Sequence, residues 1–467
     1  MKWLELFGHP AAQSGLMDMR SLNSLVTDSS AASSSWGSGV RIINGMVNQQ
    51  GDRTPLTTLY ELFGQQGWAR GLVTTTEITH ATPAGFATCV DNRDKATTIA
   101  AQYYDRRVEI LLGGGRKFFD PKHRKDKRDL RGDFATAGYC VMNTVDDLQR
   151  APLDRPWLGT FSKSHLPFVI DHPNDPTSAL VPSLAAMTAA ALKKLEREPH
   201  FILQVEGGRV DHAAHNSDAV SAMHEMISFD EALEVCLEFQ KRVPDTLLVV
   251  TTDHGNANIG LNGTGDGYGQ SLWNFKKVAN VNASFPEILK RMRITDPPDP
   301  KKVDEEKDDE ADKKKEAAKS KEEKDREAAE KKKKDENVVS PKEIAAVIYE
   351  LTGYKPSERR AGLLRPYVQK KGDPLYEMMK SDVCALGQLM GNYHALGFIG
   401  NAHTSDYVSI LALGPGAEKF AGFIPNTDVF HRYLEFAKID FRNPQEHLIA
   451  GAPYPHTPED TEAYRIV

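Results

Sequence analysis

Five short apolar runs, each ending in polar residues or glycine, mark the predicted strands of this 467-residue chain. They cover residues 71–78, 108–114, 200–208, 246–254 and 407–416. Continuous runs of this kind are typical of strands buried on both faces of a mostly parallel sheet. Between them, residues 181–198 and 219–242 carry apolar side chains at the spacing of amphipathic helices. The alternation predicts an α/β sandwich with helices on both faces of a central sheet.

One segment interrupts this pattern. Residues 300–336 are nearly all Lys, Glu, Asp and Ala, so they offer almost no apolar surface to bury. We expect a charged low-complexity insertion, either disordered or a solvated helix. We expect the rest of the chain, within 1–467, to form a single domain. After the insertion, Ser340 and Glu343 predict a capping box at the start of a new helix.

The overall charge and the apolar content narrow the class of protein. The formal net charge of −7 gives no support to nucleic-acid binding, which usually shows as a basic excess. No stretch is apolar enough to span a membrane, and residues 1–15 lack the apolar core of a signal peptide. The four cysteines form no CxxC pair, and we expect buried thiols in preference to disulfides.

The first candidate segment for chemistry covers residues 26–39, where Asp28 and Ser29 precede a run of small residues and Trp36. We expect a turn from a strand into a helix, because small residues let the backbone approach a ligand closely. Free N–H groups at the start of that helix suit a phosphate. Ser29 is therefore a candidate nucleophile, although serine-rich turns are common and this segment alone does not establish one.

The second segment covers residues 201–215, an apolar strand followed by polar residues. Glu206 ends the strand, at the edge where open α/β sheets place ligands. Asp211 and His215 are four residues apart, so they project from one face of a predicted helix, and His212 adds a further polar group. Burying such a cluster is costly without a metal ion or a partner, which favours metal binding.

Two further segments carry histidine. The strand at 246–254 ends in Asp253 and His254, which are both good zinc ligands, although a strand-end cap is an equal alternative. His403 precedes the last predicted strand, and alone it would be an ordinary loop residue. Together, the two Asp–His pairs, His403 and Glu206 supply enough ligands for zinc plus a harder ion such as magnesium.

These segments resemble the motifs of the alkaline phosphatase family, in the family's order. Residues 26–40 are similar to its nucleophile motif, and residues 79–87 and 92–94 to its magnesium-binding threonine and phosphate-binding arginine. Further matches are the segments LLGGGRKFF, VEGGRVDHAAH and VVTTDH and the late AHT. The resemblance runs from about Val26 to about Gly416 and implies the same α/β fold.

The resemblance also implies a role for each matching residue. Ser29 would be the nucleophile that becomes phosphorylated, and Arg93, held by Asp28, would clamp two phosphate oxygens. The implied cofactors are two zinc ions and one magnesium ion. Their implied ligands are Asp211, His215 and His403 for the first zinc, Asp253 and His254 for the second, and Thr82 and Glu206 for magnesium. His80 would lie near the magnesium and His212 near the phosphate.

The same resemblance implies an enzyme that hydrolyses small phosphate monoesters through a phosphoserine intermediate. Family members are often homodimers, and the family suggests an exported or periplasmic protein. Residues 1–15 as they stand show no signal for export, so the location stays open.

The start of the chain departs from the family's pattern. The family begins with a buried strand ending in Asp-Gly, and that Asp bridges the second zinc and the magnesium. Only 28 residues precede Ser29, and none of them predicts such a strand, so Asp18 is not assigned this role. We therefore expect a chain without this strand and ligand, with its true start upstream of Met1.

Two alternatives remain open at this point. A phosphodiesterase or sulfatase on the same fold usually places a threonine or a modified cysteine or serine at the nucleophile position. The Asp-Ser-Ser turn and the spacing to Arg93 favour a monoesterase. The second alternative is a non-catalytic remnant that binds metal or phosphate, which only the missing carboxylate favours.

Overall fold

The computed structural model describes residues 1–263, 267–292 and 340–445. The charged insertion predicted at 300–336 lies outside the described residues. The chain divides into two compact units, and the prediction of a single domain stays a prediction. The first unit comprises Met1–His212, Ala222–Asn256 and His403–Val467, and the second comprises Ala213–Ser221 and Ala257–Ala402.

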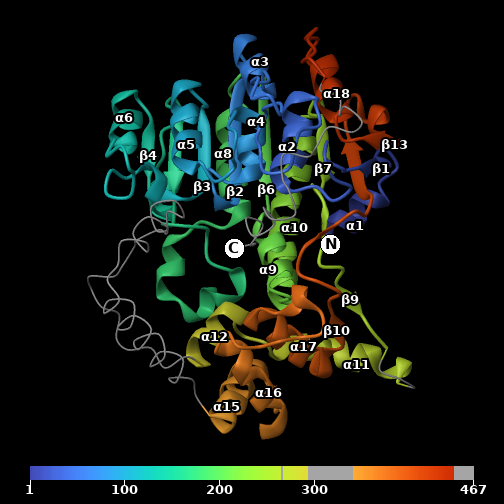
Figure 1. Cartoon of the computed structure of the whole chain (residues 1–467). Helices are drawn as coiled ribbons and strands as arrows, with labels where there is room; N and C mark the ends of the chain where they lie inside the picture. Colours follow the sequence, from blue (N-terminus) through green and yellow to red (C-terminus); the bar gives the residue numbers. More distant parts are fainter. Residues whose placement is uncertain (264–266, 293–339, 446–467) are drawn as a thin grey trace. The chain divides into compact units, whose positions relative to one another are not determined.

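Two sheets form the centre of the first unit (Figure 1). One has five parallel strands, in the order β4 (Cys140–Met142), β5 (Trp157–Thr160), β3 (Ile110–Gly114), β2 (Ala69–Glu77) and β6 (Phe201–Glu206). The other has the order β13 (Gly422–Pro425), β1 (Gln13–Asp18), β12 (Val408–Leu413) and β7 (Leu248–Thr251). Strand β12 is antiparallel to both of its neighbours. The predicted, mostly parallel α/β architecture is therefore confirmed.

Neighbouring residues of the five-stranded sheet enter separate apolar cores. Leu72 and Leu111 belong to one cluster of buried side chains, whereas Val73 and Leu112 belong to another. Successive side chains of a strand point to opposite faces, so a strand covered on both sides needs an unbroken apolar run. This requirement explains why the sequence shows runs in place of alternation.

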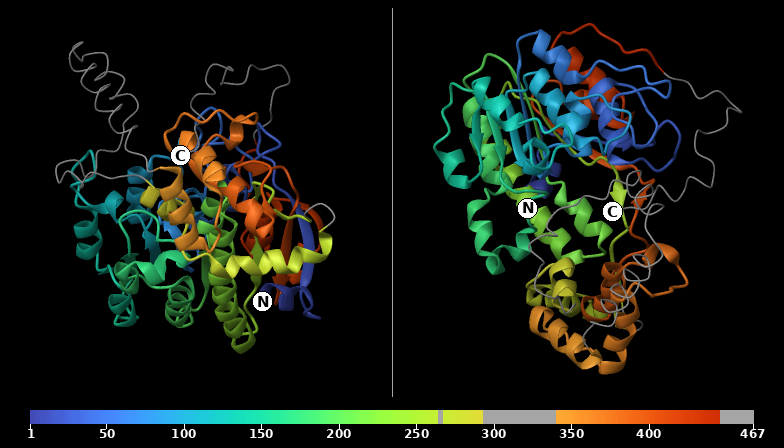
Figure 2. Two further views of the ribbon diagram at one scale, coloured as in Figure 1. Left: turned by 90° about the horizontal axis from the view of Figure 1, so that it is seen from below. Right: turned by 60° about the vertical axis from the view of Figure 1, so that its left-hand side comes forward.

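Helices lie on both sides of these strands (Figure 2, left). Leu62 of α3 packs in the first cluster and Met187 of α8 in the second, and both helices contact β2. The α-helices that lie in or enter this unit are α1 (Lys2–Phe7), α2 (Ser29–Ser38), α3 (Leu59–Gln65), α4 (Ala81–Ala87), α5 (Ala96–Asp105), α6 (Leu130–Thr136), α7 (Val145–Gln149), α8 (Leu184–Leu195), α9 (Arg209–His215), α10 (Ala219–Arg242) and α18 (Asp428–Phe436). Its short elements are β8 (Gly255–Asn256), β11 (His403–Thr404), η1 (Arg116–Phe119), η2 (Val169–Asn174), η3 (Pro176–Leu180) and η7 (Ala417–Phe420).

The second unit is mainly helical in its described part. Its elements are β9 (Gly260–Leu261), η4 (Tyr268–Gln270), α11 (Ser271–Lys276), η5 (Lys277–Asn280), α12 (Phe285–Met292), α15 (Pro341–Thr352), α16 (Glu358–Val368), η6 (Glu377–Met379), α17 (Asp382–His394) and β10 (Leu396–Gly397). The capping box predicted for Ser340 and Glu343 is present at the start of α15. Each side chain there satisfies a backbone N–H that the first turn of a helix would otherwise leave unpaired.

Strand β1 is an element that the apolar pattern did not predict: Gln13–Asp18 pairs with β12 on one side and β13 on the other. It is not the buried strand of the family's pattern, because most of its side chains are partly or fully exposed and Met19, not glycine, follows Asp18. Asp18 is not among the candidate site residues, since its carboxylate forms ion pairs with Arg20 at 3.0 Å and Arg41 at 3.2 Å. Strands β6 and β7 are the edge strands of their respective sheets within the described residues.

Helices α2 and α4 approach each other closely at two glycines. A Cβ atom on Gly37 would lie 1.8 Å from the carbonyl oxygen of Gly85, and one on Gly85 would lie 2.2 Å from Oγ of Ser33. No side chain fits at that spacing, so the sequence of small residues after Ser29 serves helix packing as well as any ligand. The contact packs the last turn of α2 directly against α4.

Replacing Gly37 by alanine should therefore force the two helices apart. We expect the free energy of unfolding to fall by about 3 kcal/mol, as is typical of an overpacked core, in urea titrations followed by circular dichroism. Gly269→Ala is the matched control, because a Cβ there would have no atom within 4 Å. Equal stability of the two variants would contradict the close packing.

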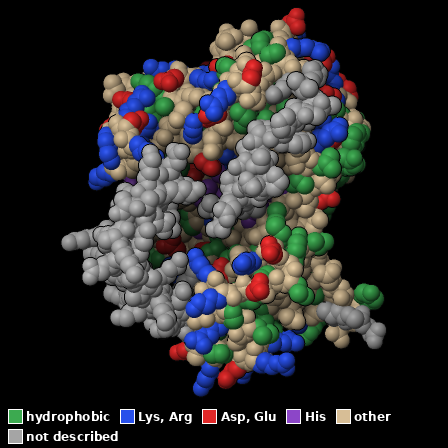
Figure 3. All heavy atoms as spheres, in the orientation of Figure 1, with side chains coloured by type: hydrophobic (Ala, Val, Ile, Leu, Met, Phe, Trp, Pro, Cys, Tyr) green, Lys and Arg blue, Asp and Glu red, His purple; other side chains and the backbone are tan. Residues whose placement is uncertain are grey.

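Surface charge, helix hydrophobicity and the state of the cysteines are the remaining features of the described residues. Lys and Arg side chains are scattered among Asp and Glu on the face that Figure 3 shows. No helix in the described residues is long and apolar enough to cross a membrane. All four cysteines are free thiols; Cys384 is buried and the other three are partly buried.

Candidate functional site

Ser29 is the first residue of helix α2. The Asp28 carboxylate caps that helix by accepting the N–H of Ala31 at 2.8 Å. Residues 19–28 form a loop, so the expected strand before the turn is wrong, while the expected helix start is present. The Ser29 hydroxyl lies 3.0 Å from Nε2 of His254, at the positive end of the helix dipole.

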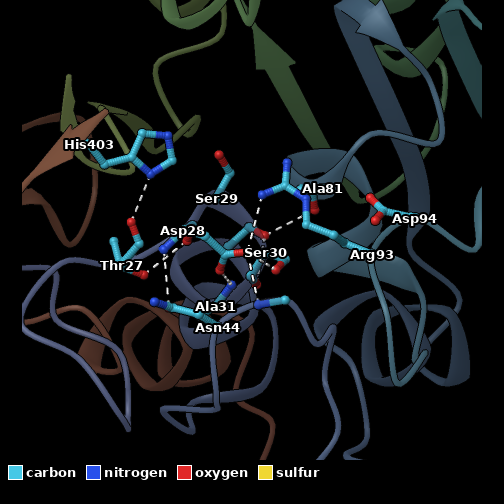
Figure 4. A network of polar contacts seen from close by, with 12 residues as sticks. Thr27, Asp28, Ser29, Ser30, Ala31, Asn44, Ala81, Arg93, Asp94 and His403 are labelled. Atoms are coloured by element: carbon cyan, nitrogen blue, oxygen red, sulfur yellow. Dashed lines mark hydrogen bonds and ion pairs between the residues drawn. The ribbon is translucent and has the colours of Figure 1, made fainter. Parts of the chain in front are cut away.

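Asp28 also connects the helix start to Arg93. Its Oδ2 accepts hydrogen bonds from Oγ of Ser30 at 2.7 Å and from the N–H of Gly45 at 2.9 Å, and it pairs with Nη1 of Arg93 at 3.1 Å. Figure 4 shows this network, with the Ser29 hydroxyl directed away from it. The arrangement holds a guanidinium beside the serine without consuming the serine hydroxyl.

A second group of side chains gathers around Asp211. His403 Nε2 lies 3.6 Å from Asp211 Oδ1, and its Nδ1 lies 2.8 Å from the carbonyl oxygen of Thr27. A carbonyl only accepts, so Nδ1 of His403 donates, and the neutral form of the ring carries its lone pair at Nε2. His215 follows one turn after Asp211 on α9. Asp211, His215 and His403 each offer a ligand atom within 4.8 Å of the others.

Asp253 and His254 follow β7 and lie next to the same residues. His254 Nε2 is 3.1 Å from Asp253 Oδ2, and its ring stacks on the His403 ring with centroids 3.5 Å apart. Burial lowers the pKa of His254, but the charge and hydrogen bond of Asp253 outweigh it and raise that pKa to about 9. The Nδ1 atom of His254 is buried without a partner.

Glu206 ends β6 as predicted, and its carboxylate meets hydroxyl groups. The Thr74 hydroxyl donates a hydrogen bond to Oε2 of Glu206 at 2.5 Å, and the Thr82 hydroxyl of α4 also bonds to this carboxyl. Burial raises the pKa of Glu206 to about 7, and the charges of Asp253 and Asp211 act in the same direction. The structure therefore brings Thr82 and Glu206 together within reach of the charges of the other two carboxylates.

The remaining predicted residues form a histidine cluster. The rings of His80, His165 and His212 lie with centroids 4.5 to 5.6 Å apart. Nε2 of His80 is 3.5 Å from Nη2 of Arg93, and Nδ1 of His212 is 2.8 Å from Nη1 of Arg209. Burial, with Arg209 and Lys117 nearby, lowers the pKa of His165 to about 3. Burial also lowers the pKa of His80 well below its usual value. The three rings thus lie beside two guanidinium groups, those of Arg93 and Arg209.

Sequence reasoning missed several partners of the predicted residues. Thr74 and Thr76 contact Glu206, and Asn256 donates to Oδ1 of Asp211 at 2.5 Å. The threonine run at the end of a predicted buried strand was an available signal, because buried hydroxyls need partners. His165 comes from the loop after β5, and its sequence context carries no signal for the site.

Comparison with known proteins gives a consistent result. The profile of the alkaline phosphatase family matches residues 9–439. Alkaline phosphatase 3 of Bacillus subtilis is 30% identical over 413 residues, covering 86% of this chain and 75% of that protein. The repressible alkaline phosphatase of Saccharomyces cerevisiae is 33% identical over 303 residues, covering 58% and 53%.

A solved structure agrees with these sequence matches. The alkaline phosphatase of Thermus thermophilus superposes with a TM-score of 0.80 at 29% identity, covering 95% of this chain and 86% of that one. The similarity thus includes both the fold and the segments that carry Ser29, Arg93 and the Asp–His pairs. This chain belongs to the alkaline phosphatase family and is a phosphatase.

Proposed function

We propose that this phosphatase hydrolyses phosphate monoesters through a phosphoserine at Ser29, in a site built for two zinc ions and one magnesium ion. The observation that carries the proposal is the position of the Ser29 hydroxyl. It lies at the start of α2, 3.0 Å from His254 Nε2, on a helix whose cap residue Asp28 also holds Arg93.

The donor set around Ser29 fits metal ions. Three partly buried carboxylates, those of Glu206, Asp211 and Asp253, interact electrostatically, and such repulsion is costly without a cation. The imidazoles of His254 and His403 stack at 3.5 Å beside them. Carboxylate plus imidazole suits zinc, whereas hydroxyl plus carboxylate suits magnesium.

The ligand assignment follows this chemistry. Asp211, His215 and His403 would hold one zinc, Asp253 and His254 the other, and Thr82 and Glu206 the magnesium. When bound, zinc would lower the pKa of the serine hydroxyl and of water and offset the charge on the leaving oxygen. The shared fold of the Thermus thermophilus alkaline phosphatase supports this assignment.

The residues of the chain account for the rest of the reaction. The Ser29 oxygen forms a bond to phosphorus while the bond from phosphorus to the alcohol oxygen breaks, and water later displaces the serine oxygen. Arg93 donates to two non-bridging oxygens of the phosphoryl group and offsets charge that builds there. The N–H groups at the start of α2 point to the same position.

Comparing an aryl phosphate monoester with an aryl phosphate diester tests this proposal. The wild-type protein should hydrolyse the monoester faster. In a diester, the second ester group takes up one of the phosphoryl oxygens to which Arg93 would donate, and it removes the negative charge of that oxygen. Arg93→Ala should raise KM for the monoester at least about tenfold, the scale of a lost charge-assisted hydrogen bond. Lys95→Ala is a matched control, because Lys95 is exposed and pairs with Asp91. A faster diester rate would favour a phosphodiesterase.

A further inference from the structure

Three contacts hold Arg209 in place, two of them to its guanidinium and one to its backbone. Its Nη1 lies 2.8 Å from Nδ1 of His212, and its Cζ lies 3.7 Å from the centre of the Phe168 ring, a short cation–π distance. The backbone N–H of Arg209 donates to Oγ1 of Thr75 at 3.1 Å. A planar, delocalised cation stacked on a ring loses little further freedom when it donates to a neighbour.

The ring under Arg209 is itself anchored. Phe168 is 4% exposed, and the next residue, Val169, donates its N–H to the Glu225 carboxyl at 2.8 Å. Glu225 belongs to α10 and is 2% exposed. The loop between β5 and η2 is therefore tied to a long helix, so the platform for Arg209 is part of the folded framework.

The contact with Arg209 determines which nitrogen of His212 carries the proton. A guanidinium has donors only, so Nδ1 of His212 must accept. A neutral imidazole that accepts at Nδ1 carries its hydrogen at Nε2. His165, whose ring centroid is 4.5 Å from that of His212, is fixed in the same way, because its Nδ1 accepts the N–H of Glu77 at 3.1 Å.

We propose that Arg209 is a positioning residue that holds His212 in the form with hydrogen at Nε2, so that His212 donates a hydrogen bond to the substrate phosphoryl group. The inference rests on the proposed function, in which His212 lies near the phosphate. Arg209 acts only through His212 and does not itself touch the phosphate.

Nitrogen NMR of the imidazole rings tests the first half of this proposal without any turnover. Protein labelled with ¹⁵N-histidine should show His212 with hydrogen at Nε2, assigned by the signal that is lost in His212→Gln. Arg209→Met keeps an apolar contact to Phe168 but removes the donor, so His212 should shift toward a mixture of the two forms. Hydrogen at Nδ1 in the wild type, or an unchanged ring in Arg209→Met, would overturn the proposal.

Binding of inorganic phosphate, measured by calorimetry, tests the second half. Arg209→Met should weaken binding about tenfold, the scale of one hydrogen bond to a charged group, whereas Arg209→Lys, which keeps a donor, should weaken it less. In the His212→Gln background, Arg209→Met should have little effect, because the amide donates without help.

The outcomes separate a positioning role from a structural one. Equal weakening by Arg209→Met in both backgrounds would show a general structural role and overturn the proposal. If Arg209→Met does not fold, Phe168→Leu, which removes the ring on which the guanidinium stacks, carries the same comparison. If phosphate binds to neither the wild type nor the variants, the proposed function fails, while the NMR result still decides whether Arg209 sets the His212 proton.

Discussion

Ser29→Ala should lower kcat/KM for an aryl phosphate monoester on the order of 10⁴-fold, because the hydroxyl that bonds to phosphorus is lost. The fold should persist, since the Asp28 carboxylate and not the Ser29 side chain caps α2. Steady-state rates at alkaline pH with zinc and magnesium present, together with circular dichroism, provide the measurement.

A serine elsewhere on the same helix provides the control. Ser35 is buried, and its hydroxyl donates to the carbonyl of Ala31 within α2. Ser35→Ala should therefore keep most of the activity and change stability by about 1 kcal/mol. Equal turnover by the wild type and Ser29→Ala would remove Ser29 from the reaction. A wild-type rate no higher than the background of the Ser29→Ala control would support the alternative of a non-catalytic remnant.

Removal of divalent metal ions should have a comparably large effect. We expect a strong chelator to lower the rate at least about 10³-fold, because zinc activates both serine and water in such sites. Zinc and magnesium together should restore the rate, and magnesium alone should not. This expectation rests on Asp211, His215 and His403, whose possible ligand atoms lie within 4.8 Å of one another.

The same experiment has a readout that does not depend on activity. Free zinc at about 100 times its Kd should raise the free energy of unfolding by about 2.7 kcal/mol, since it offsets repulsion among partly buried carboxylates. Asp253→Asn should reduce that gain, whereas Asp154→Asn, a carboxylate beside the surface cavity near Trp157, should leave it unchanged. Full activity in metal-free protein, verified by elemental analysis, would contradict the metal site.

The apolar pattern located β2, β3, β6, β7 and β12, but it missed the short buried strand β5 and it missed β1. In Gln13–Asp18 only Met17 is fully buried, and Leu16 is 46% exposed. The strand forms because β12 and β13 supply partners from the far end of the chain. A Cβ on Gly15 would lie 2.5 Å from the carbonyl oxygen of Phe420. Close packing of the backbone, and not hydrophobicity, therefore requires glycine at this position. Whether a segment with so few buried side chains forms a strand depends on its neighbouring strands, which the local sequence does not show.

For the site, the sequence named the main residues but not the partners that orient them. Ser29 and His254 are 225 positions apart and meet at 3.0 Å, and only the family resemblance placed them together beforehand. Thr74 and Asn256 hold Glu206 and Asp211 through hydrogen bonds that no local pattern reveals. Such contacts depend on the pairing of distant strands, which periodicity within one segment cannot predict.

Which residue carries the phosphoryl group during turnover decides whether Ser29 is the nucleophile. The enzyme, mixed with a phosphate monoester and quenched in acid during turnover, can be digested and its peptides analysed by mass spectrometry. We expect one phosphoryl group on Ser29, absent from Ser29→Ala and absent from wild-type protein without substrate. Turnover with no phosphopeptide, or with phosphate on a different residue, would contradict it.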